Sequence, residues 1–150
     1  MNGFEDMPLG YLLYRATAAL RAEVTATVLE PLRLAFPEYL CLRMLSQLPG
    51  QSNAQLARVA VVSPQAMNKV IRELQSRGLV TRPATASSGR SLPAELTREG
   101  KALLERIDPR MAEAERRVLA NLTERDGTEF RRLLAAVGSP DFPGRATVTA

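Results

Sequence analysis

The strongest constraint on the fold comes from two short helical segments in the middle of the chain, each of which opens on a serine. Ser52 is followed three residues later by Gln55, the spacing of a capping box in which the two side chains satisfy free backbone N–H groups. Ser63 is a good N-cap residue, and Pro64 after it needs no N–H partner at the first helical position. These signals predict one helix from residue 52 to about residue 60 and a second from residue 63 to Gly78, which supplies the C-terminal stop.

The second of these helices has one apolar face and one face without acids. At about 100° per residue, four apolar side chains fall together and should face the core: Met67, Val70, Ile71 and Leu74. The opposite face carries amides, cations and a hydroxyl: Gln65, Asn68, Lys69, Arg72 and Ser76. Amides make paired hydrogen bonds with adenine edges and cations bind guanine or phosphate, so this face suits the major groove of DNA. The alternative is a solvated helix that lacks acids by chance.

Two short extended runs follow, at residues 79–83 and 92–96, and they flank a tip of small polar residues and glycine. This pattern predicts a β-hairpin, in which Pro93 fits only an edge position. Two helices joined by a short turn and followed by a hairpin form a winged helix-turn-helix. We therefore expect a mainly α fold with a small two-stranded β wing, and we place the DNA-binding lobe at residues 51–100.

Apolar residues at helical spacing predict further helices on both sides of this lobe. Before it, a long helix from Leu9 is closed by Pro31, and a second apolar segment ends at Pro49 and Gly50. After it, Thr97 caps a helix that Pro109 should bend, and a last helix runs from about residue 124 to residue 137. We assign residues 1–50 to dimerisation and a hinge, residues 101–138 to dimerisation, and residues 139–150 to a disordered tail rich in glycine, proline and small polar residues.

The terminal helices carry apolar positions that the central lobe alone cannot cover. These predict a dimer interface formed by Leu9, Leu13, Leu133, Leu134 and Val137. An intramolecular bundle is the alternative. A helix-turn-helix that reads a palindrome needs two-fold symmetry, which favours the dimer.

Charge and composition narrow the function. The net charge of +4 falls entirely between residues 52 and 100, where seven bases face three acids, and this asymmetry is typical of a polyanion-binding module. The chain has no histidine and a single cysteine, so an enzyme, a metal site and a cofactor are not expected. The N-terminal residues contain acids where a signal peptide needs bases, and no apolar run reaches membrane-spanning length. We expect a cytoplasmic protein without a membrane partner.

The order of these marks resembles the MarR (multiple antibiotic resistance regulator) family. In that family a helix-turn-helix is followed by R-G-L-V, here residues 77–80, by a wing arginine, here Arg90, and by L-T-x-x-G, here Leu96, Thr97 and Gly100. The resemblance extends to the flanking helices and implies a homodimer whose terminal helices interlock. It also implies two winged lobes in successive major grooves, wing tips in the minor groove, and release from DNA by a ligand in many members. Where the family usually has glycine in the helix-turn-helix turn, this chain has Val61, which predicts backbone strain.

Helix position divides the expected DNA contacts into two kinds. Gln65 and Asn68 lie in the first turns of the second helix and should read base edges. Arg72, Ser52 and Asn53 should anchor phosphate. With the remaining residues of the helix starts, the R-G-L-V motif and the wing, the expected DNA-binding set is Ser52, Asn53, Ser63, Pro64, Gln65, Asn68, Lys69, Arg72, Arg77 and Arg90.

Two further sites each have two interpretations. Tyr14, Tyr39 and Arg43 lie where the resemblance puts a pocket for small aromatic acids, and an arginine can pair with a carboxylate. The alternative is that the tyrosines are core and Arg43 is solvated. Cys41 is either a redox sensor, as in the redox-sensing branch of such families, or buried filler. That branch places its reactive cysteine in the first helix, whereas Cys41 lies in the second, so the resemblance favours filler.

Two classes of function remain open. The first is a DNA-binding transcriptional regulator, in particular a repressor that a small aromatic molecule releases from a pseudo-palindromic operator. The second is a winged-helix module for protein interaction or dimerisation that has no operator. Salt dependence separates them, because DNA binding releases condensed counterions and weakens steeply as salt rises.

Overall fold

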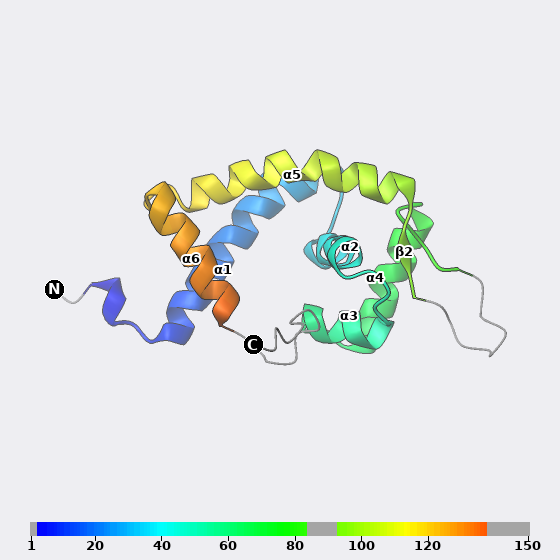
Figure 1. Ribbon diagram of the computed structural model, residues 1–150, viewed down its shortest axis with the longest axis horizontal. Helices are drawn as coiled ribbons and strands as arrows, with labels where there is room; N and C mark the ends of the chain where they lie inside the picture. Colours follow the sequence, from blue (N-terminus) through cyan, green and yellow to red (C-terminus); the bar gives the residue numbers. More distant parts are fainter. Residues whose placement is uncertain (1–2, 84–92, 138–150) are drawn as a thin grey trace, which may run out of the picture.

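The computed structural model describes residues 3–83 and 93–137, and these form an arch of helices (Figure 1). The N-terminal elements are η1 (Phe4–Asp6), α1 (Leu9–Val24), η2 (Thr25–Leu29), η3 (Glu30–Leu32) and α2 (Phe36–Gln47). The central elements are α3 (Asn53–Ala60), α4 (Pro64–Ser76), β1 (Val80–Thr81) and β2 (Glu95–Leu96). The chain then continues through α5 (Arg98–Val118) and α6 (Glu124–Ala136).

The long helix α5 joins the two ends of the arch (Figure 1). At one end lie α1 and α6, and at the other lie α3, α4 and the two strands, with α2 between them beneath α5. Helix α2 packs against α3, α4 and α5, so it connects the central lobe to the long helix. This arrangement confirms the expected mainly helical fold with a two-stranded wing and N- and C-terminal helices. Within residues 3–83 and 93–137, no helix combines the length and the apolar character needed to cross a membrane.

The starts of α3 and α4 have the predicted caps. Ser52 Oγ accepts a hydrogen bond from the backbone N of Gln55 at 3.2 Å, and Gln55 Oε1 accepts one from the backbone N of Ser52 at 2.8 Å. Ser63 Oγ accepts from the backbone N of Ala66 at 3.1 Å. Gly78, with φ +71°, follows the end of α4 in the left-handed conformation that glycine adopts at little cost. Local side-chain chemistry therefore fixes the limits of both helices.

The first helix differs from the single long helix that the sequence predicted. The α-helical pattern ends at Val24, five residues of π-helix follow, and Pro31 lies inside the short 3-10 turn η3. Thr27 donates its hydroxyl hydrogen to the carbonyl oxygen of Glu23 at 2.8 Å, and such bonds compete with the regular helical ladder. The widened turn accompanies the complete burial of two adjacent residues, Val28 and Leu29, in the core.

The core lies around α2, beneath the middle of α5. As predicted, α4 buries Met67, Ile71 and Leu74, while Val70 is half-buried. Helix α5 remains one helix through Pro109 and buries Ile107. The same core includes Cys41, Leu42 and Leu45 from α2 and Leu56 from α3.

The wing is attached to α5 by a close backbone contact. The strands pair in antiparallel register, Val80 with Leu96 and Thr81 with Glu95. Thr97 then caps α5, donates its hydroxyl hydrogen to the carbonyl oxygen of Gly78 at 2.6 Å and accepts from the backbone N of Gly100 at 3.0 Å. A Cβ at Gly100 would lie 2.2 Å from the carbonyl oxygen of Leu79, so only glycine fits there. This contact explains why a threonine and a glycine stand three residues apart at the start of α5.

Candidate nucleic-acid interface

The exposed face of α4 has the composition that the sequence predicted. Gln65, Lys69 and Arg72 are exposed and Asn68 is half-buried. Neither Lys69 nor Arg72 forms a salt bridge within the part of the chain that the structure describes. The face therefore presents amides together with cations whose charge is not neutralised by a described carboxylate. Such a surface can bind base edges and phosphates.

The N-terminus of α3 adjoins this face. Asn53, the first residue of α3, donates a hydrogen bond from its side-chain nitrogen Nδ2 to the side-chain oxygen Oδ1 of Asn68. Ser52 is exposed beside it. The structure therefore joins two residues for which the sequence predicted different tasks, phosphate anchoring for Asn53 and base reading for Asn68.

Arg77 has partners that the sequence analysis missed. Its guanidinium donates from Nη1 to the carbonyl oxygen of Arg33 at 2.8 Å and from Nη2 to that of Leu32 at 3.0 Å. Its Nη1 also lies 3.7 Å from a carboxylate oxygen of Glu38. Arg77 thus ties the end of α4 to the turn before α2. No local signal could reveal contacts that span 39 to 45 residues, and we leave Arg77 out of the proposed DNA-contacting set.

Two of the other predicted DNA contacts lie at the start of α4. Ser63 and Pro64 are exposed at the start of α4, close to Gln65 in sequence. Arg90 and the wing tip lie outside the described residues.

The three residues predicted to bind an aromatic acid fall into two places. Tyr39 is buried, its ring packs against Phe36 with ring centroids 6.3 Å apart, and the guanidinium carbon of Arg43 lies 5.7 Å from its ring centre. Arg43 also forms a salt bridge with Asp108 of α5. Tyr14 is 74% exposed on α1, and no hydrogen bond or ring contact joins it to the other two within the described chain.

Cys41 lies in the core and has no exposed surface. Burial raises the pKa of its thiol from 9.0 to about 12, so the reactive thiolate is suppressed at neutral pH. These observations support the packing role that its position favoured.

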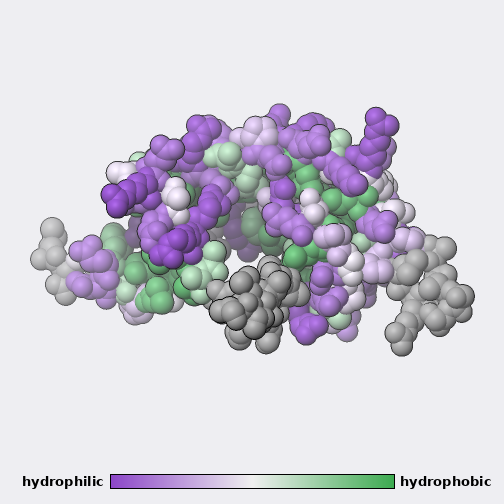
Figure 2. All heavy atoms as spheres, viewed as in Figure 1, coloured by the Kyte–Doolittle hydropathy of each residue, from purple (hydrophilic) through white to green (hydrophobic). Residues whose placement is uncertain are grey.

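The terminal helices expose the apolar residues that the sequence assigned to an interface. Leu9 is 68% exposed, Leu133 is 48% exposed and Leu13, Leu134 and Val137 are also exposed. Figure 2 shows hydrophobic surface gathered at the end of the arch formed by α1 and α6. The exposure of so many large apolar side chains on two neighbouring helices is characteristic of an interaction surface.

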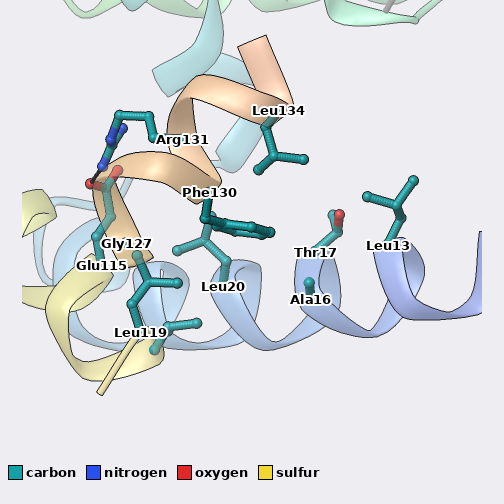
Figure 3. Close-up of a pocket in the computed structure, with 11 residues that line it drawn as sticks. Leu13, Ala16, Thr17, Leu20, Glu115, Leu119, Gly127, Phe130, Arg131 and Leu134 are labelled. Atoms are coloured by element: carbon teal, nitrogen blue, oxygen red, sulfur yellow. Dashed lines mark hydrogen bonds and ion pairs between the residues drawn. The ribbon is translucent and has the colours of Figure 1, made fainter. Parts of the chain in front are cut away.

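A cavity of about 330 Å³ opens between α1, α5 and α6 (Figure 3). Leu20, Phe130 and Leu134 point into it, and the salt bridge from Arg131 to Glu115, at 2.7 Å, lies at its edge. A second cavity of about 340 Å³ lies beside Thr27 and Pro109. Neither cavity is lined by Tyr14, Tyr39 or Arg43.

The capped helix pair, the wing and the basic face of α4 together define a winged helix-turn-helix protein of the DNA-binding type. Residues 34–92 match the sequence profile of the MarR family. The HTH-type transcriptional repressor Rv2887 of Mycobacterium tuberculosis is 57% identical to this chain over 135 residues, which cover 90% of this chain and 96% of the relative. The chain belongs to the MarR family.

Two solved structures of the same mycobacterial protein are similar to this chain over most of its length. The complex of Rv2887 with DNA is 53% identical, covers 89% of this chain and all of the other, and gives a TM-score of 0.76. The complex with salicylic acid is 57% identical, covers 89% of this chain and 98% of the other, and gives a TM-score of 0.75. Proteins of the MarR family are dimeric transcriptional regulators, a class distinct from enzymes.

Proposed function

We propose that this protein is a homodimeric transcriptional repressor that binds a pseudo-palindromic operator and is released by a small aromatic carboxylate. The observation that carries the proposal is the exposed face of α4, where amides lie beside cations that no described carboxylate neutralises. The central charge excess and the adjoining wing support the same assignment. Operator binding also implies a location in the cytoplasm.

The residues of the interface divide between base reading and anchoring. Gln65 and Asn68 lie in the first two turns of α4, the part of a recognition helix that approaches base edges. Lys69 and Arg72 suit phosphate oxygens, as do the free N–H groups at the starts of α3 and α4. Ser52, Asn53, Ser63 and Pro64 belong to these helix starts, and Arg90 of the wing is proposed to enter the minor groove.

The dimer places two copies of α4 on the two halves of the operator. Its interface draws on Leu9, Leu13, Leu133, Leu134 and Val137, because α1, α6 and the C-cap of α6 expose these residues at one end of the arch. A two-fold symmetric protein matches a two-fold symmetric operator.

The effector site is proposed around Arg43, whose guanidinium lies over the Tyr39 ring and pairs with Asp108. An aromatic carboxylate could use both the ring and the cation. The salicylic acid complex of the mycobacterial relative supports this ligand class. A ligand that prefers the conformation unable to bind DNA must oppose DNA with the same coupling free energy. Tyr14 would join such a site only from elsewhere in the dimer, because in its own chain it stands apart.

DNA binding is tested by titrating operator and scrambled duplexes, the operator being selected first from random DNA. Gln65→Ala should lose about 1 to 3 kcal/mol on the operator and little on scrambled DNA, because it removes a base contact. Arg72→Ala should weaken both duplexes alike and lower the salt slope by roughly one per subunit. Equal losses on both duplexes for Gln65→Ala would mean that α4 faces phosphate. Binding to DNA that is weak and insensitive to salt would favour the protein-interaction module instead.

The effector assignment is tested with salicylate in the same titration. Salicylate should lower operator affinity of the wild-type protein, and Arg43→Ala should reduce this effect because the cation is gone. Arg106→Ala, which removes an exposed arginine of α5, is the control and should keep the wild-type response. An unchanged response in Arg43→Ala would exclude this site.

A further inference from the structure

The side chain of Asn68 is held on one side by another helix. Asn53 of α3 donates a hydrogen bond from Nδ2 to the Asn68 oxygen Oδ1, and both residues are half-buried. Asn53 follows Ser52, whose capping box with Gln55 closes the first turn of α3. The donor therefore comes from the capped start of a neighbouring helix.

This bond sets which atoms of Asn68 are available. A carboxamide has its oxygen on one side and its NH₂ group on the other, and the two differ as acceptor and donor. With the oxygen turned toward Asn53, the NH₂ group is the part that points elsewhere, and no side chain of the described residues accepts a hydrogen bond from it. Asn68 therefore offers two donors to a ligand on the surface of α4.

We infer that Asn53 is a positioning residue that fixes Asn68 as a hydrogen-bond donor, so that Asn68 selects guanine and rejects cytosine at the base it contacts. This inference rests on the proposed function, in which α4 lies in the major groove. Guanine presents two acceptors there, N7 and O6, whereas cytosine presents the N4 donor. Adenine would need a donor and an acceptor together from the same amide, and the acceptor of Asn68 faces α3.

The test uses variants that reverse the bond without changing side-chain size. In Asn53→Asp the carboxylate only accepts, so Asn68 must turn its NH₂ group inward and present its oxygen outward. In Asn68→Asp the bond from Asn53 remains and an oxygen again points outward. Both variants should shift the preferred base toward cytosine at the same position. Asn53→Ala leaves Asn68 free to rotate and should relax the preference.

The measurement is the affinity of each variant for duplexes that differ only at the base pair that Asn68 contacts. Wild-type protein should prefer guanine to cytosine by about tenfold, within the range of one good base contact. The two Asp variants should reverse this ratio, and Asn53→Ala should bring it below about threefold. Ala54→Asp is the matched control: it adds the same charge one residue along α3, at an exposed position, and should weaken all duplexes alike with the ratio unchanged.

The outcomes separate the inference from the function on which it rests. A wild-type preference for adenine, or a guanine preference that survives in Asn53→Asp and Asn53→Ala alike, would overturn the positioning role while operator binding stands. Wild-type protein that binds operator and scrambled duplexes equally would overturn the proposed function itself. Reversal in Asn53→Asp, or relaxation in Asn53→Ala where the Asp variant folds poorly, establishes the inference when the control is unchanged. Reversal in Asn68→Asp shows that the same side chain makes the base contact.

Discussion

The central lobe and the terminal helices have similar amphipathic sequences but very different burial. Helix α4 has 13 residues and buries three of them completely, Met67, Ile71 and Leu74. Helix α6 also has 13 residues and buries none. Helix α1 buries only its last residue, Val24.

This difference shows that a single chain covers the apolar side chains of the central lobe but not those of the terminal helices. In the central lobe, α2, α3, α4 and the wing cover one another. At the other end, α1 and α6 leave large apolar side chains exposed and a cavity unfilled. Because exposed apolar surface of this kind is unfavourable in water, we expect the terminal helices, and not the central lobe, to require a second copy of the chain.

The largest expected effect follows from charging the exposed face of α6. Leu133→Asp combined with Leu134→Asp should raise the dimer dissociation constant at least a hundredfold, because each interface would bury four carboxylates. Sedimentation velocity over a range of concentrations measures the change. Thr128→Asp combined with Ala135→Asp adds the same charge to the opposite face of α6 and should leave the dimer intact. Equal effects from the two pairs would break the assignment of this face to the interface.

The second effect lies at the close contact between the wing and α5. Gly100→Ala should destabilise the fold by about 2 to 3 kcal/mol, because the new methyl group meets the backbone oxygen of Leu79 and the backbone must shift. Urea unfolding followed by circular dichroism gives the free energy. Gly10→Ala in α1 is the control, since a Cβ there meets nothing within 4 Å. A Gly100→Ala protein as stable as the wild type would mean that the wing does not pack on α5 this closely.

The third effect is a pH dependence caused by Cys41. Burial raises the pKa of this thiol from 9.0 to about 12, so above pH 9 the unfolded chain loses a proton that the folded chain keeps. Folding stability should therefore fall as pH rises through this window, by about 1.4 kcal/mol per pH unit. The comparison is between wild type and Cys41→Ala, unfolded in urea at pH 8 and pH 10. Parallel pH profiles in the two proteins would contradict a buried neutral thiol.

The smallest effect is a gain in stability from relieving backbone strain. Val61 has φ 56° and ψ 47°, a left-handed conformation that a β-branched residue adopts at a cost, and it is 89% exposed. Val61→Gly should stabilise the protein by about 0.5 to 1 kcal/mol, since it removes the strain and loses almost no packing. Val61→Ala keeps a Cβ and should gain less. Thermal unfolding distinguishes the two variants, and a loss of stability in Val61→Gly would contradict the strain.

Much of the central lobe could be predicted because its signals are local. The caps at Ser52 and Ser63, the stop at Gly78 and the apolar face of α4 depend on residues at most a few positions apart. The strain at Val61 was also foreseen, from the glycine that usually stands in that turn.

The features that the sequence did not predict depend on contacts between residues far apart in the chain or on how buried side chains pack. The bond from Asn53 to Asn68 spans 15 residues, and Arg77 reaches carbonyl oxygens 44 and 45 residues away. The π-helix in Thr25–Leu29 contains no glycine or proline, and it coincides with the burial of Val28 and Leu29. Such features follow from tertiary packing, which residue spacing does not encode.

Amide hydrogen exchange at several protein concentrations tests the central claim, that the central lobe is complete in one chain and the terminal helices are not. On dilution below the dimer dissociation constant, amides of α1 and α6 should lose protection while those of α3 and α4 keep theirs. Protection that is independent of concentration in α1 and α6, or that disappears at the same concentration in all four helices, would contradict the account.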